Sequence, residues 1–92
     1  MDTTRQQVYQ DALDKWGLDA QWGMVHEECL ELAMAIHKFR RTQDMDSIID
    51  EVADVKIMME QVELYVDMDK VNERMDFKIE RLKGKLHKRT ET

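Results

Sequence analysis

Residues 25–39 read VHEECLELAMAIHKF, a mostly apolar run that contains three glutamates. On a helix, which turns about 100° per residue, Glu28 and Glu31 lie about 60° apart on one face. The apolar residues that share this face are Met24, Leu32, Ala35 and Phe39. The stretch therefore predicts a helix that directs two carboxylates toward apolar neighbours rather than toward water.

The other side of this predicted helix, which spans about residues 20 to 40, is also rich in apolar residues. Leu30, Ala33 and Met34 lie there, and Glu27 lies about 100° from Glu28, at the edge of the acidic face. A helix that is apolar nearly all round is typical of a buried position. We therefore expect this helix to pack against neighbours on both sides.

Residues 47–65 repeat the arrangement in a second predicted helix. Glu51 and Asp54 lie three residues and about 60° apart on one face. The apolar residues within about 60° of Glu51 are Ile48, Val55, Met58 and Val62. A second apolar stripe on another side consists of Ala53, Ile57 and Leu64. Two apolar sides on each of two helices predict a bundle that a second subunit extends.

The composition favours helix throughout the chain. The 92 residues include no proline and only three glycines, whereas strong helix formers such as Met, Leu, Glu, Lys, Gln and Ala are plentiful. We predict an all-α, four-helix-bundle-like fold in a single domain over residues 1–92. A chain of this length buries only a modest core, and small domains often gain stability by association. We therefore expect a homodimer or a dimer of dimers.

Capping residues divide the chain into four predicted helices. The residues expected at the helix starts are Thr3 or Thr4, Asp19, Asp46, and Asp67 or Asp69. The expected helix ends lie near Lys15, residue 40, residue 65 and His87. Gly17 suits the left-handed conformation that commonly closes a helix, so we expect it to end the first one.

The charge balance narrows the range of partners. A net charge of −6 and an isoelectric point near 5.0 argue against a nucleic-acid-binding surface, which requires clustered Lys and Arg. The N-terminal residues lack the apolar region of a signal peptide, and the single Cys29 cannot form an intrachain disulfide. No apolar run approaches the roughly 20 residues of a membrane span. We expect a cytoplasmic protein without a membrane segment, and a cationic partner or a metal as the binding partner.

The two acidic faces predict a metal site. Antiparallel packing of the two helices would bring together four carboxylates, those of Glu28, Glu31, Glu51 and Asp54. Two like charges about 4 Å apart repel by roughly 4 kcal/mol at an effective dielectric constant near 20. No Lys or Arg lies on either acidic stripe, so a divalent cation is the natural counter-charge, and oxygen ligands suit Mg²⁺ or Mn²⁺. The alternative is that both acidic pairs lie on solvated helix faces.

The same residues resemble a known signature. EECLE at residues 27–31, followed after nineteen residues by EVAD at 51–54, resembles the EExxE and ExxD motifs of the MazG-like, all-α nucleoside triphosphate pyrophosphohydrolases. The flanking sequences EECLELAMAIHKFRR and IIDEVADVKIMMEQV fit the family as well. The resemblance covers roughly residues 13–86, and the double motif is more specific than either half.

The resemblance implies a reaction and a set of roles. Members of the family cleave nucleoside triphosphates to a monophosphate and pyrophosphate, with Mg²⁺ held by the motif carboxylates. The implied metal ligands are Glu28, Glu31, Glu51 and Asp54. Glu27 is implied to orient or deprotonate the attacking water, or to bind an additional metal. Lys78 and Arg81 are implied to hold the triphosphate, although a solvated helix end is the alternative interpretation of the basic C-terminal stretch.

A second class of function stays open on the sequence. The chain could be a non-catalytic helical dimerisation module, such as a small regulator, with acidic clusters on its surface. Three aromatic residues, Trp16, Trp22 and Tyr65, could stack on a nucleobase, but aromatic residues at helical spacing more often belong to a core. Metal dependence separates the enzyme from the dimerisation module.

Overall fold

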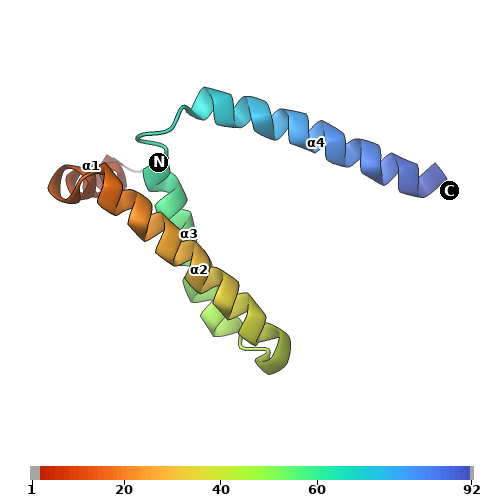
Figure 1. The fold of residues 1–92 in the computed structure, drawn as a ribbon, viewed down its shortest axis with the longest axis horizontal. Helices are drawn as coiled ribbons and strands as arrows, with labels where there is room; N and C mark the ends of the chain where they lie inside the picture. Colours follow the sequence, from red (N-terminus) through yellow and green to blue (C-terminus); the bar gives the residue numbers. More distant parts are fainter. Residues whose placement is uncertain (1–2, 92) are drawn as a thin grey trace.

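The computed structural model describes the backbone of residues 3–91 and the side chains of residues 4–88. It contains four helices and, within those residues, no strand, which confirms the predicted all-α class (Figure 1). The helices are α1 (Thr3–Trp16), α2 (Leu18–Thr42), α3 (Met45–Val62) and α4 (Met68–Glu91). None of these helices combines the length and apolarity that crossing a bilayer requires.

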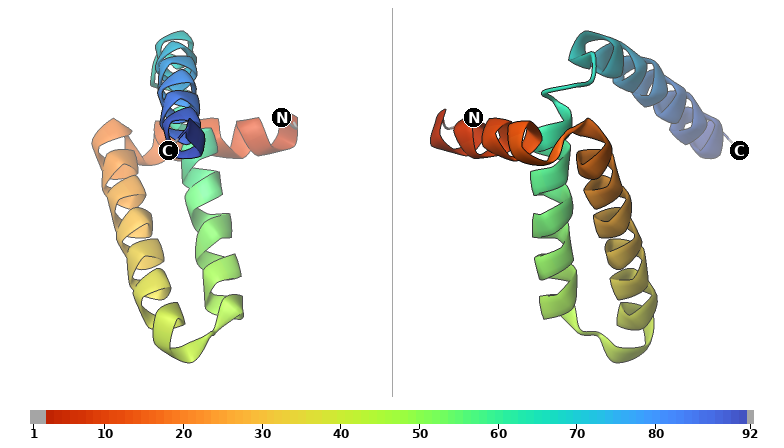
Figure 2. Two further views of the ribbon diagram at one scale, coloured as in Figure 1. Left: turned by 90° about the vertical axis from the view of Figure 1, so that its right-hand side faces the viewer. Right: turned by 60° about the vertical axis from the view of Figure 1, so that its left-hand side comes forward.

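Helices α2 and α3 form an antiparallel hairpin that is the centre of the structure (Figure 2). Only two residues, Gln43 and Asp44, connect them. Gln43 adopts a left-handed conformation with φ of 60°, and its backbone N–H donates a hydrogen bond to the carbonyl oxygen of Phe39 at 2.8 Å. This αL cap ends α2 and reverses the chain within one turn. The short connection holds the two helices side by side.

Two of the predicted capping residues are wrong. Asp44, not Asp46, caps α3, because its carboxylate accepts hydrogen bonds from the backbone N–H of Ser47 at 3.2 Å and the Ser47 hydroxyl at 3.0 Å. Gly17, not Asp19, precedes α2; its φ of 85° ends α1 and lets the next helix begin at once. Asp46 and Asp19 lie instead in the first turns, where a negative charge is favoured by the helix dipole.

Helix α1 lies across the open end of the hairpin and contacts both α2 and α3. Its anchor is Tyr9, which is only 3% exposed and donates a hydrogen bond to Glu60 Oε1 at 2.7 Å. Arg5 donates to both carboxylate oxygens of Glu60 at 3.2 Å. The hydrogen bond from Tyr9, followed by that from Arg5, holds the pKa of Glu60 below its ordinary value. Glu60 therefore ties α1 to α3 as a charged acceptor.

Helix α4 leaves the other three helices after a turn at residues 63–67 (Figure 1). Asp67 caps it by accepting a hydrogen bond from the backbone N–H of Lys70 at 3.2 Å, which agrees with one of the two predicted capping residues. Within the described residues, α4 makes no helix–helix contact with α1, α2 or α3. The expected four-helix bundle is therefore not formed by one chain, because the turn points the fourth helix away from the hairpin.

The resulting core is small for a chain of this length. Among the side chains that the structure describes, the buried apolar ones are those of Tyr9, Val25, Ala35 and Met58. The radius of gyration is 17.1 Å, against about 12 Å for a compact domain of the same number of residues. The expected oligomer stays a prediction, and the sparse core is the structural reason to keep it.

Candidate metal centre

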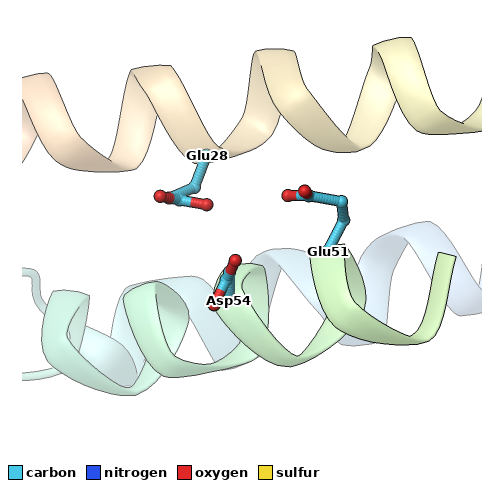
Figure 3. A group of neighbouring side chains, drawn as sticks. All are labelled: Glu28, Glu51 and Asp54. Carbon is cyan, nitrogen blue, oxygen red and sulfur yellow. The ribbon is translucent and has the colours of Figure 1, made fainter. Parts of the chain in front are cut away.

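Three carboxylates converge in the groove between α2 and α3 (Figure 3). Glu28 extends from α2, and Glu51 and Asp54 extend from α3 toward the same space. One oxygen of each carboxylate lies within 4.8 Å of the other two, and all three side chains are half-buried. The predicted meeting of the two acidic faces is present for these three residues.

The local sequence explains this convergence. Glu51 and Asp54 are three residues apart, and on a helix this spacing puts both side chains on one face. Glu28 lies on the face of α2 that also carries the buried residues Val25 and Ala35, so it is drawn toward α3 by the packing of its neighbours. The two-residue connection then sets the two faces opposite each other.

The carboxylates raise one another's pKa values. Burial raises the pKa of Glu28 above its ordinary value, and the charges of Glu31, Asp54 and Glu51 raise it further. Burial likewise raises the pKa of Glu51, with additional repulsion from Glu31 and Asp54. Every charged neighbour that shifts either pKa raises it, so the cluster holds negative charge without local compensation.

Two buried oxygen atoms in the cluster lack hydrogen-bond partners. They are Oε2 of Glu28 and Oε2 of Glu51. A buried carboxylate oxygen without a donor is costly, and native proteins usually satisfy it with a donor, a water or a metal ion. An all-oxygen set of acidic ligands fits a hard divalent cation such as Mg²⁺ or Mn²⁺ better than zinc. The unsatisfied atoms therefore fit a cation site.

Glu31 lies beside this cluster rather than inside it. Its side chain is exposed, yet it is the strongest charged neighbour of both Glu28 and Glu51. With Glu51 it lines a pocket of about 290 Å³ that runs from the cluster toward the α2–α3 connection. Glu31 is thus close enough to act with the three converging carboxylates, at the mouth of the groove.

The remaining predicted residues lie farther from the cluster. Glu27 is exposed and is the weakest charged neighbour of Glu28. Lys78 and Arg81 are exposed on α4, which points away from the hairpin (Figure 1). A single chain therefore brings the carboxylates together but does not bring these two cations to them.

Sequence reasoning missed Lys38. It was set outside the acidic stripe of α2, although it lies only about 20° from Glu31, and the structure places it on the wall of the same pocket as Glu31 and Glu51. The pocket also includes residues next to the α2–α3 connection, among them Thr42 and Asp44, so a residue near the end of α2 can line it. Its position seven residues after Glu31, two turns along the same side of the helix, was the available signal.

Two buried glutamines were also missed. Gln21 and Gln61 are 3% and 7% exposed, and Gln61 Oε1 has no hydrogen-bond partner. Each lies seven residues, about two helical turns, from a cluster carboxylate, Gln21 before Glu28 and Gln61 after Asp54, and so on the same helix face as that carboxylate. This spacing of seven was the signal in the sequence.

The three aromatic residues differ in their surroundings. Trp22 and Tyr65 pack edge to face, with ring centroids 5.1 Å apart. Trp16 is instead 60% exposed, so it does not belong to the core of a single chain.

The raised pKa values predict a pH dependence of stability in the metal-free protein. Below an ordinary carboxyl pKa of 4.5, the protonated Glu28 and Glu51 contribute their full stabilisation. As pH rises from there through the raised pKa values, the folded state must release protons that the unfolded state has already lost, so the free energy of unfolding falls. Glu60 has the opposite effect on stability, and at lower pH. Because its pKa is lowered, its contribution to the free energy of unfolding is present above pH 4.5 and is lost as the pH falls below 4.5.

Urea unfolding at several pH values above 4.5 in the presence of a chelator measures this slope. The double variant Glu28→Gln, Glu51→Gln is the control, and it should show a smaller slope. An unchanged slope in the variant would contradict the assignment of the effect to these two carboxyls.

Comparisons of the chain with protein-family models, with curated protein sequences and with solved structures give no match.

Proposed function

We propose that the chain is a Mg²⁺-dependent nucleoside triphosphate pyrophosphohydrolase, as its resemblance to the MazG-like family implies. The observation that carries the proposal is the cluster of Glu28, Glu51 and Asp54, whose oxygens lie within 4.8 Å of one another. The cluster combines residues of both motifs from two different helices. Exposed helix faces do not usually gather three half-buried carboxylates and leave two of their oxygens unsatisfied.

The proposed role of each carboxylate follows from its position. Glu28, Glu51 and Asp54 would hold the cation, and Glu31 would add a fourth carboxylate from the mouth of the groove. When bound, Mg²⁺ would neutralise charge on the triphosphate and lower the pKa of an attacking water. Glu27 would accept a proton from that water or orient it, from its exposed position at the edge of the cluster.

The phosphates need positive charge as well. Lys38 lines the pocket beside the carboxylates and is the candidate within the same chain. Lys78 and Arg81 are the candidates from the family resemblance, and they require α4 to lie near a hairpin. A cytoplasmic location and a homo-oligomer complete the proposal.

Product analysis tests this function directly. Incubation of the full chain with each common nucleoside triphosphate and Mg²⁺ should release the monophosphate and pyrophosphate in equal amounts, measured by ion-exchange chromatography. The variant Glu28→Gln under the same conditions should release far less of both. Orthophosphate together with a diphosphate would show that another bond is cleaved, and no hydrolysis of any triphosphate would contradict the proposal.

A non-catalytic helical dimerisation module is the second candidate. The observation that favours it is the large apolar surface of one chain, which includes residues on every helix such as Val8, Met34, Ile49 and Leu82. This candidate explains the apolar surface but not the buried carboxylate oxygens. It predicts no specific response to Mg²⁺.

A further inference from the structure

Helix α4 carries an apolar stripe that nothing else in the described chain covers. Val71, Met75, Ile79 and Leu82 recur at helical spacing and lie within about 80° of one another. Met75, Ile79 and Leu82 are each more than half exposed, and α4 makes no contact with α1, α2 or α3 in the described residues (Figure 2). Most of a helix's stability comes from packing its apolar face, so this stripe calls for a covering surface.

A row of basic residues follows one edge of the stripe. Its members, which lie within about 80° of one another next to the apolar residues, are Lys70, Arg74, Lys78, Arg81 and Lys85. The acidic residues of α4 lie on the other side of the helix, about 140° to 200° from Val71; they are Asp69, Glu73, Asp76 and Glu80. The surface that covers the stripe must therefore receive several cations along one edge.

The exposed area of one chain matches what a stable dimer buries. The accessible surface is 7605 Å² for 11.0 kDa, whereas a compact monomer of this mass exposes about 5,600 Å². The excess is about 2,000 Å² per chain. Obligate homodimers bury roughly 2,000 to 5,000 Å² in total, which two such chains would supply.

The distribution of charge along the chain indicates which surface of a second copy covers the apolar stripe of α4. Residues 68–91 contain eight Lys or Arg and five Asp or Glu, a net charge of +3. Residues 1–67 contain six Lys or Arg and fifteen Asp or Glu, a net charge of −9. Two α4 helices would repel each other, whereas α4 and the acidic hairpin region attract.

We propose that α4 is an exchange arm: in a dimer of this chain, the apolar stripe of each α4 packs on the acidic α1–α3 unit of the other copy. The exposed apolar residues of the α2–α3 hairpin, among them Leu30, Met34 and Ile49, then gain cover at the same time as the stripe. The arm brings Lys78 and Arg81 to the acidic unit of the second copy, where they would bind the phosphates of the substrate. One chain alone does not bring these two residues there. This last role in phosphate binding rests on the proposed function, but the arm itself does not.

The first test is the mass in solution. Light scattering of the full chain at micromolar concentration should give twice 11.0 kDa. Leu82→Glu, in the middle of the stripe, should give a monomer. Phe77→Glu is the matched control and should remain dimeric. Phe77 is 54% exposed, against 51% for Leu82, it lies outside the stripe, and its ring centroid is 4.8 Å from Cζ of Arg74 on the same helix. A wild-type monomer, or two variants of equal mass, would overturn the proposal.

Salt dependence distinguishes the two ways in which α4 could make a dimer. If α4 packs on the acidic unit, raising NaCl from about 50 to about 500 mM should increase the dissociation constant, because screening removes attraction. If two basic α4 helices pair with each other, the same change should lower the dissociation constant. A lowered constant in sedimentation equilibrium would therefore refute the exchange.

Cross-linking identifies the contact itself and does not depend on any variant folding. Equal amounts of ¹⁴N- and ¹⁵N-labelled chains are mixed, allowed to exchange and treated with a carbodiimide, which joins lysines to carboxylates in contact. Mass spectrometry should find mixed-isotope links from Lys70, Lys78 or Lys85 to acidic residues within 1–67. Mixed-isotope links confined to α4, or links only within one isotope, would overturn the proposal.

Discussion

Replacement of Asp54 by Asn is expected to reduce triphosphate hydrolysis by orders of magnitude while making the metal-free protein more stable. Asp54 raises the pKa of both Glu28 and Glu51 through repulsion, so the amide removes one like charge at nearly constant shape. In the proposed site the same change would remove one charged ligand from the three converging carboxylates, and a cation would then be held less well against the substrate. Stability and activity should therefore move in opposite directions, as at other sites selected for function.

Melting curves and turnover rates of wild type and Asp54→Asn, both with chelator and with excess Mg²⁺, measure this prediction. With chelator the variant should melt higher, and with saturating Mg²⁺ the difference should narrow or reverse. Asp76→Asn makes the same chemical change at an exposed position on the acidic side of α4, where an effect within about 0.5 kcal/mol is expected. Undiminished turnover and coincident curves for Asp54→Asn would remove the metal site from the proposal.

Addition of Mg²⁺ to the wild-type protein should produce the second large effect, an increase in stability. A ligand that binds only the folded state stabilises it by about 2.7 kcal/mol at a concentration 100 times its dissociation constant. For a chain of this size, that corresponds to a rise in Tm on the order of 10 to 20 °C. The physical reason is the relief of repulsion among carboxylates whose pKa values are raised without the cation.

Differential scanning fluorimetry across a Mg²⁺ titration gives the size of this rise. The double variant Glu28→Gln, Glu51→Gln is the control for non-specific effects of salt on a protein with a net charge of −6. Equal rises in Tm for the wild type and the variant would contradict a specific cation site and would favour the dimerisation module.

The helices could be predicted because their causes are local. The chain has no proline, and Gly17, Asp44 and Asp67 each terminate or start a helix through contacts within four residues. The errors are local too. Asp46 and Asp44 are equally good capping residues in composition, and the left-handed conformation of Gln43 decided between them by starting α3 at Met45.

The candidate site could be predicted only in part, because helical angles show on which face of a helix a residue lies but not how deeply its side chain is buried. Glu28 and Glu31 share one face of α2, yet Glu28 is half-buried in the cluster and Glu31 is exposed at its mouth. That difference in burial depends on where α3 lies along α2, and the periodicity of the sequence gives no information about this position. Lys38 could have been found from its angle, since it lies only about 20° from Glu31, but the angle alone does not show that both residues line one pocket.

The direction of α4 could not be predicted at all. Its apolar stripe indicates that the helix is covered, but periodicity does not identify the covering surface. The turn at residues 63–67 decides the direction, and it contains no glycine or proline to mark a particular geometry.

The hairpin is restrained at both ends, and this has a consequence for how a cation would bind. Gln43 and Asp44 close one end, and α1 bridges both helices at the other through Tyr9 and its bond to Glu60. Because both ends are held, the two helices cannot move apart to separate the carboxylates. The repulsion between the carboxylates therefore raises their pKa values instead of displacing the helices. The groove is therefore preorganised for the proposed cation, which would find its oxygen ligands already close together and would lose little binding free energy to rearrangement of the backbone.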